Sequence, residues 1–195
     1  LFAAERAINP ALDAWFKAGF VSRFTLADLA HYAPGTLGGI FYAQLSDNAL
    51  DVNIVPPFEP KNDFEYFQLR AGQTHDLEHI LGGGGFDFIG ELVPYYMRLT
   101  NIFTHLSPEL AGELCAFSIL GSTRIITRAV LHYPQTWLVA QNAMESGARV
   151  GRESAPIFMM TCEDVFHLPL EEAREALGIR GAQFVDTAAA SAQWN

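Results

Sequence analysis

The sequence predicts an all-α protein that folds as a single-domain helical bundle over residues 1–195. Three observations support this prediction. Small polar residues that cap helices stand directly before segments whose apolar residues recur at helical spacing. No stretch alternates apolar and polar residues as a half-buried strand would. The chain contains no internal repeat and no low-complexity linker, and its length is sufficient for one core of its own.

The first helices are defined by their cap residues. Asn9 and Pro10 form a cap and first-turn pair, and the helix that they open ends at Gly19. Thr25 stands three residues before an aspartate, which is the spacing of a capping box and predicts a helix up to Pro34. Further helices are predicted over residues 36–46, 63–70, 74–81 and 108–133, from 134 past 144, and over 169–178.

Glycine and proline predict the breaks between the middle helices. Gly72 is expected to end one helix and Thr74 to cap the next. Helical spacing returns at Phe88, and Pro94 predicts a mild kink, because Gly90 one turn earlier has no side chain to meet the proline ring.

Composition and charge exclude several classes of protein. The formal net charge is −10 and no basic run occurs, which argues against a nucleic-acid partner and against a polybasic lipid-binding patch. No signal peptide and no membrane-spanning apolar run is recognisable, although the first residue is not methionine. We expect an intracellular protein, cytoplasmic or peripheral on the inner membrane face. Cys115 and Cys162 are expected to be buried free thiols, with a single disulfide between them as the alternative. Residues 181–195 are expected to form a mobile tail.

The segment around residues 74–97 concentrates metal-binding chemistry. On a helix, His75 and His79 are one turn apart and share a face, roughly 40° from each other. Asp76 lies about 100° from His75 and borders that face. Two imidazoles and a carboxylate can hold a divalent ion such as zinc. The alternative is a surface or core histidine pair, with Asp76 serving the helix dipole.

Glu91 can join this group only if the helix breaks. Twelve residues of continuous helix would place Glu91 about 18 Å from His79. The four glycines at 82–85 would cost on the order of 4 kcal/mol inside a helix, so the helix is expected to end there. The chain can then turn back and bring Glu91 beside the histidines. The sequence therefore predicts a metal site between two helices joined by a glycine-rich break.

The sequence indicates a functional role less strongly for several other polar and aromatic residues. Glu78 is expected to point away from the histidines into solvent, and Asp164 with His167 repeats the D-x-x-H spacing that a two-metal carboxylate site would use. Arg124 and Arg128 could meet an acidic head group or pair with carboxylates. Side chains that could line an apolar groove, or belong to an ordinary core, are Phe41, Tyr42, Phe86, Phe88, Tyr95, Tyr96 and Met97.

The pattern H-D-x-x-H, followed by eleven residues and Glu91, resembles the signature of the ubiquinone (coenzyme Q) biosynthesis protein family, the fourth protein in the Coq series. Residues 69–70, the stretch 137–151 and the ending 170–179 also look like that family. The similarity extends from about residue 32 to residue 179. The run of four glycines departs from the more varied, proline-containing loop expected there.

This resemblance implies an α-helical protein that binds zinc or another divalent ion through His75, Asp76, His79 and Glu91. It implies peripheral association with the membrane where polyprenylated quinone precursors reside. Family members are thought to organise other enzymes of the pathway into a complex. They are also implicated in replacing the C1 carboxyl of the polyprenyl-hydroxybenzoate precursor with a hydroxyl.

Three functional hypotheses follow. The first is a metal-dependent enzyme of ubiquinone biosynthesis that carries out oxidative C1 decarboxylation of a polyprenylated aromatic acid. The second is a lipid-binding scaffold that recruits other ubiquinone biosynthesis enzymes and whose metal site is structural. The third is a zinc hydrolase in which Asp76 replaces the usual general-base glutamate. A homodimer is one option for the oligomeric state.

Overall fold

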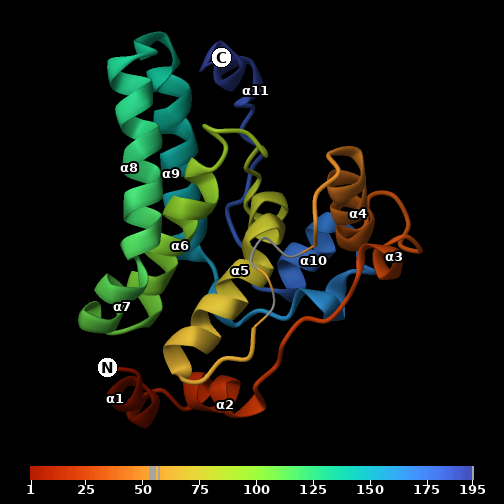
Figure 1. Cartoon of the computed structure of the whole chain (residues 1–195), viewed down its shortest axis with the longest axis vertical. Coiled ribbons are helices and arrows are strands. Elements are labelled where there is room, and N and C mark those ends of the chain that lie inside the picture. The colour runs from red at the N-terminus through yellow and green to blue at the C-terminus, as the bar shows by residue number, and fades with distance from the viewer. Residues whose placement is uncertain (53–55, 57, 195) are drawn as a thin grey trace. The chain divides into compact units, whose positions relative to one another are not determined.

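The computed structural model describes residues 1–52, 56 and 58–194, and its regular elements are helices (Figure 1). Within the described residues, extended pairing is limited to an isolated antiparallel bridge between Thr36 and Pro169. The predicted all-α fold class is therefore confirmed.

The chain divides into two compact units, and each unit draws on two stretches of sequence. The first comprises Leu1–Leu77 and Phe158–Leu177, and the second comprises Glu78–Ile157 and Gly178–Asn195. The division falls inside helix α5 (Asp63–Gly82), which supplies residues to both units. Folding as a single domain stays a prediction.

The helices of the first unit begin mostly where their caps predict. The Asn9 side chain accepts a hydrogen bond from Leu12 N at 3.1 Å, and Gly19 ends that helix with a φ of 57°. This unit also contains the first part of α5. Its other helices are α1 (Phe2–Ile8), α2 (Pro10–Ala18), α3 (Leu26–Leu29), α4 (Leu37–Asp47), η3 (Cys162–Val165) and α10 (Leu170–Ala176), with η2 (Ile157–Met159) at the division.

Helix α3 is shorter than the sequence predicts. The capping box of Thr25 and Asp28 is present, but the helix ends at Leu29 instead of continuing to Pro34. After Leu29 the chain forms backbone hydrogen bonds between residues three apart, which is the pattern of a tighter turn and not of an α-helix. Gly35 then adopts a φ of 88°, which is incompatible with a right-handed helix.

Helix α5 is longer than predicted, and the expected break at Gly72 is wrong. The helix is continuous, and Thr74 lies inside it, where its hydroxyl donates to Arg70 O at 3.2 Å instead of capping a new helix. An interior glycine costs about 1 kcal/mol relative to alanine. Burial of one leucine stabilises by about 1.5–3 kcal/mol, and Leu69 and Leu77 are both buried. Tertiary packing therefore outweighs the local preference.

The second unit is built around α6, α8 and α9, which lie side by side (Figure 1). Glycines allow α6 and α9 to approach closely: a Cβ on Gly147 would lie 2.3 Å from Val93 O, and one on Gly151 would lie 2.2 Å from Met97 O. The helices and short helical turns of this unit are α6 (Leu92–His105), α7 (Pro108–Leu114), α8 (Ala116–Leu131), η1 (Pro134–Thr136), α9 (Trp137–Glu153), α11 (Ala188–Ser191) and η4 (Ala192–Trp194).

Two predicted helix boundaries in this unit need correction. Helix α6 begins at Leu92 instead of Phe88, so Pro94 is its third residue. A proline in the first turn needs no kink, because the N–H that it lacks has no acceptor within the helix. The helix predicted over 108–133 begins at Pro108 but divides at Cys115, where α7 and α8 meet at a bend of 55°.

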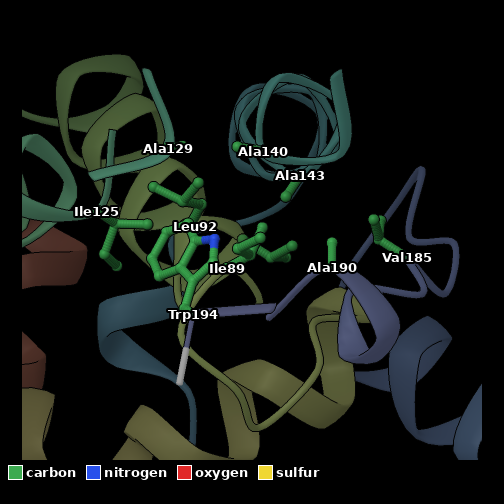
Figure 2. Close-up of a cluster of buried hydrophobic side chains, with 10 residues drawn as sticks. Ile89, Leu92, Ile125, Ala129, Ala140, Ala143, Val185, Ala190 and Trp194 are labelled. Atoms are coloured by element: carbon green, nitrogen blue, oxygen red, sulfur yellow. The ribbon is translucent and has the colours of Figure 1, made fainter. Parts of the chain in front are cut away.

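The core of the second unit includes the end of the chain (Figure 2). Val185, Ala190 and Trp194 pack with apolar residues of the turn before α6 and of helices α6, α8 and α9. Residues 183–194 are docked through these three buried side chains, whereas Phe184 is exposed. Mobility of residues 181–195 stays a prediction. The buried residues of this core are Ile89, Leu92, Val93, Ile125, Ala129, Ala140, Ala143, Val185, Ala190 and Trp194.

Two further predictions concern the thiols and membrane spans. Cys115 and Cys162 are both buried and form no disulfide, as predicted, and burial raises the pKa of the Cys115 thiol to about 11. Among the described residues, no single helix has both the length and the hydropathy of a membrane span; α7 and α8 reach that threshold together, across their bend.

Candidate metal centre

The two histidines of the motif lie on α5, near its C-terminal end. Because that helix is continuous, it places His75 and His79 one turn apart on the same face, as the spacing predicts. His79 is buried, with 1% of its surface exposed, and its ring stacks on Phe86 at a centroid distance of 4.6 Å. His75 is partly exposed.

The helix ends at the glycines, in agreement with the sequence. Its last residue is Gly82, and Gly83 follows with a φ of 82°, a conformation that other residues rarely adopt. The chain then turns, and Gly85 O lies 2.8 Å from His79 Nδ1. The glycine run therefore both stops the helix and supplies a carbonyl that contacts the buried histidine.

The turn brings Glu91 to the histidines. Glu91 is the N-cap residue of α6, and its Oε1 atom lies 3.4 Å from His79 Nε2. His75, His79 and Glu91 each offer one ligand atom, and these atoms all lie within 4.8 Å of one another. Three of the four predicted ligand residues thus converge.

The contact with Gly85 shows which nitrogen of the His79 ring carries a proton. A carbonyl oxygen can only accept a hydrogen bond, so His79 Nδ1 must carry a proton and donate it. In the neutral ring, Nε2 then presents its lone pair toward Glu91. This is the arrangement of metal-binding histidines, whose second ring nitrogen is held by a carbonyl or carboxylate. A cation between Nε2 and the carboxylate would be attracted by both.

The separations suit a small divalent ion. Bonds of about 2.0–2.1 Å to nitrogen and oxygen place two ligand atoms of a tetrahedral zinc ion about 3.3–3.4 Å apart. The 3.4 Å between His79 Nε2 and Glu91 Oε1 matches that value and exceeds an ordinary hydrogen bond. The spacing of up to 4.8 Å within the group would require a modest side-chain adjustment.

Asp76 is not part of this converging group. It follows His75 directly, so the helix rotates its side chain by roughly 100° away from the shared face of the histidines. The structure therefore brings together three candidate ligands, and Asp76 borders the site as a partly exposed neighbour.

The burial of Glu78 differs from the prediction. The side chain was expected in solvent, but it is 1% exposed and forms an ion pair with Arg98 of α6, in which Arg98 Nη2 donates to Glu78 Oε1 at 2.9 Å. The pair joins the end of α5 to α6. Because His79 follows Glu78 and Glu91 caps α6, this ion pair helps to set the relative positions of two candidate ligands.

Asp87 is a residue of the site that the sequence reasoning missed. Its Oδ1 atom accepts hydrogen bonds from Ile89 N at 3.2 Å and Gly90 N at 3.0 Å, which shapes the turn before Glu91. An aspartate two residues before such backbone donors is a common turn signal, and that spacing could have identified it.

A tyrosine of α6 lies near the site. Burial first, and the charge of Glu91 second, raise the pKa of Tyr95. Its hydroxyl therefore stays protonated at neutral pH, and it can donate a hydrogen bond.

The remaining candidate residues do not converge in the same way. Within the described part of the chain, Asp164 and His167 belong to no group of three converging metal-ligand side chains. Arg128 donates to Trp194 O and lies over the ring of Tyr133. No ion pair with a carboxylate is formed by Arg124 or Arg128 among the residues described.

The residues named for an apolar groove fall into different environments. Phe41 and Met97 are core residues, whereas Phe86 and Phe88 are exposed and Tyr42, Tyr95 and Tyr96 are partly buried. The first unit contains a cavity of about 830 Å³, and it is lined by other side chains. Its apolar lining residues are Val21, Phe24, Leu26, Leu50, Val52, Phe58 and Leu69.

The fold resembles that of a known protein. A crystal structure of a "putative ubiquinone biosynthesis protein" from Nostoc punctiforme PCC 73102 superimposes with a TM-score of 0.65 over 88% of this chain and 76% of that chain, at 20% sequence identity. At this identity the similarity shows a shared fold. No protein-family model matches the chain, and no curated protein sequence matches it significantly.

Proposed function

We propose that this protein binds a divalent cation, preferentially zinc, through His75, His79 and Glu91, and that it acts in ubiquinone biosynthesis. One observation supports the proposal above the others: the glycine break returns Glu91 to within 3.4 Å of a buried histidine whose ring is held by a carbonyl. The similarity of the fold to the Nostoc protein supports the pathway.

Asp76 has a separate place in this proposal. A catalytic zinc site keeps one coordination position open, whereas a structural site is closed by a fourth protein ligand. Asp76 is a candidate for that fourth position, because it borders the shared face of the histidines. Zinc affinity that is unchanged in Asp76→Ala would indicate an open position.

The proposed substrate is a polyprenylated hydroxybenzoate-type acid, and the proposed reaction is its oxidative C1 decarboxylation, in which the carboxyl leaves as CO₂ and a hydroxyl takes its place. Zinc cannot change its oxidation state, so dioxygen would be the two-electron oxidant and would react with the electron-rich ring. A bound divalent ion would supply Lewis acidity toward a carboxylate or phenolate. Around it, Gly85 O holds the His79 ring, and the partly exposed side of His75 leaves an approach for an aromatic acid. We further propose that the protein works at a membrane surface with other enzymes of the pathway.

A scaffold with a structural metal is the second candidate. Its support is that the ligands come from the end of α5 and the start of α6, so a bound ion would close the turn between them. In that case removal of the metal would lower the free energy of unfolding, because ion binding would then contribute to folding.

The test compares His79→Ala and Glu91→Ala with a control, His132→Ala, which removes an exposed histidine of the second unit. Zinc content, thermal unfolding and complementation of ubiquinone synthesis are measured for each. We expect the two site variants to lose zinc and quinone synthesis while the control keeps both. Site variants that lose zinc and stay folded yet support quinone synthesis would refute a catalytic role of the metal. Equal zinc content in all proteins would refute the metal site.

A further inference from the structure

The turn that carries the candidate ligands is tied to the end of the chain through Asp87. Its carboxylate accepts from two backbone donors of its own turn and from two hydroxyls of the 183–194 segment. Thr187 Oγ1 donates to Asp87 Oδ2 at 2.6 Å, and Ser191 Oγ donates to Oδ1. Ser191 Oγ also accepts from Ile89 N at 3.0 Å. Hydrogen bonds to an ionised carboxylate are roughly twice as strong as neutral ones.

The glycine run rests directly on the same segment. Val185 N donates to Gly83 O at 2.9 Å. A Cβ on Gly83 would lie 2.3 Å from Gln183 O, and one on Gly85 would lie 2.7 Å from Thr187 Oγ1. The glycines are therefore needed for contact with residues 183–187 as well as for ending α5.

Trp194 anchors the far end of the segment. It is 2% exposed, and its Nε1 donates to Thr136 Oγ1 at 3.2 Å. Its carbonyl accepts from Arg128, and its ring stacks with Phe88 at 6.2 Å between centroids. Phe88 follows Asp87, so this anchor contacts the same turn.

These contacts lead directly to two candidate ligands. Glu91 N donates to Asp87 O at 3.1 Å, and His79 Nδ1 donates to Gly85 O. Anything that displaces Asp87 or Gly85 would therefore shift the Glu91 carboxylate or the His79 ring. Residues that orient metal ligands from behind typically change metal affinity by about 10- to 100-fold when they are removed.

We propose that the 183–194 segment is a positioning element of the cation site, and that Thr187 and Ser191 act through Asp87 to hold Glu91 and His79 in binding geometry. This inference rests on the proposed function. Docking of the segment and binding of the cation are then coupled: each stabilises the other by the same free energy. Release of the segment, for instance by a partner that binds it, would lower the cation affinity.

The test removes the two hydroxyls and follows the metal and the segment separately. Thr187→Val with Ser191→Ala is compared with Gln193→Ala, which alters an exposed residue of the same segment, and with Thr187→Ser, which keeps the hydroxyl. Zinc dissociation constants are measured by competition with a chelating dye. Hydrogen exchange of the 183–194 peptide is measured by mass spectrometry with and without zinc. Neither readout needs enzymatic activity.

We expect the double variant to bind zinc about 10- to 100-fold more weakly, and the other two variants to match the unaltered protein. Zinc should also slow hydrogen exchange of the segment in the unaltered protein, by the same factor by which docking of the segment raises the zinc affinity. If the double variant fails to fold, Ser191→Ala alone provides the same comparison.

Faster exchange of the segment in the variant with unchanged zinc affinity would overturn this inference and leave the proposed function standing. Zinc affinity of the unaltered protein equal to that of His79→Ala would overturn the proposed function, and this inference with it.

Discussion

The buried ion pair between Glu78 and Arg98 makes a strong prediction about stability. Glu78 is 1% exposed, and 13% of the Arg98 side chain is exposed. Substitution Glu78→Gln keeps the size of the side chain but removes its charge, so the guanidinium loses its carboxylate in a largely water-free place. Breaking a buried pair in this way typically costs about 3–5 kcal/mol. Because Arg98 keeps some contact with water, we expect a loss of about 3 kcal/mol.

Urea unfolding followed by far-UV circular dichroism measures this loss. With a typical slope of about 1–3 kcal/mol per molar urea, a loss of about 3 kcal/mol shifts the midpoint by about 1–3 M. The double variant Glu78→Leu with Arg98→Met removes both charges, and it should recover most of the lost stability, because no buried charge is then left uncompensated.

The matched control is Arg6→Met, which removes a cation whose ion pairs with Asp13 and Asp63 are more exposed. Exposed ion pairs contribute about 1 kcal/mol or less, so the control should shift the midpoint little. A loss below about 1 kcal/mol in Glu78→Gln would show that water reaches the pair, and it would refute the argument from burial.

Two further predictions concern a glycine and a thiol. Gly83→Ala should lower the free energy of unfolding by more than about 1 kcal/mol in urea melts, because a Cβ at a φ of 82° would lie 2.3 Å from Gln183 O; an unchanged midpoint would contradict this. The raised pKa of Cys115, about 11 in the folded protein, favours folding below pH 9 and loses that contribution as the pH rises from 9 through 11. Urea melts at pH 8 and pH 10.5 should therefore show a larger drop in stability for the native protein than for Cys115→Ala, and equal drops would contradict the prediction.

Local sequence signals predicted much of the helical structure because their physics is local. The cap at Asn9, the proline at Pro108 and the glycines after His79 act on hydrogen bonds within one or two turns. The same applies to the shared face of His75 and His79, which follows from helical spacing. The ending of α5 at Gly82 and the return of Glu91 were deduced from helix geometry and the cost of four glycines.

Tertiary structure decided the features in which distant residues compete with local preference. Gly72 lies inside a continuous helix because the burial of Leu69 and Leu77 outweighs its flexibility. Glu78 is buried because Arg98, twenty residues later, supplies the opposite charge.

The glycine break shows the same division of causes. Its sequence predicts a turn, because four glycines disfavour a helix wherever they occur. Only the fold places residues 183–194 against that turn and joins Thr187 and Ser191 to Asp87, about a hundred residues earlier. Such pairings depend on the packing of the whole second unit, and no spacing within the sequence encodes them. The sequence alone therefore determined which residues are candidate ligands, and tertiary packing decided how their side chains are held.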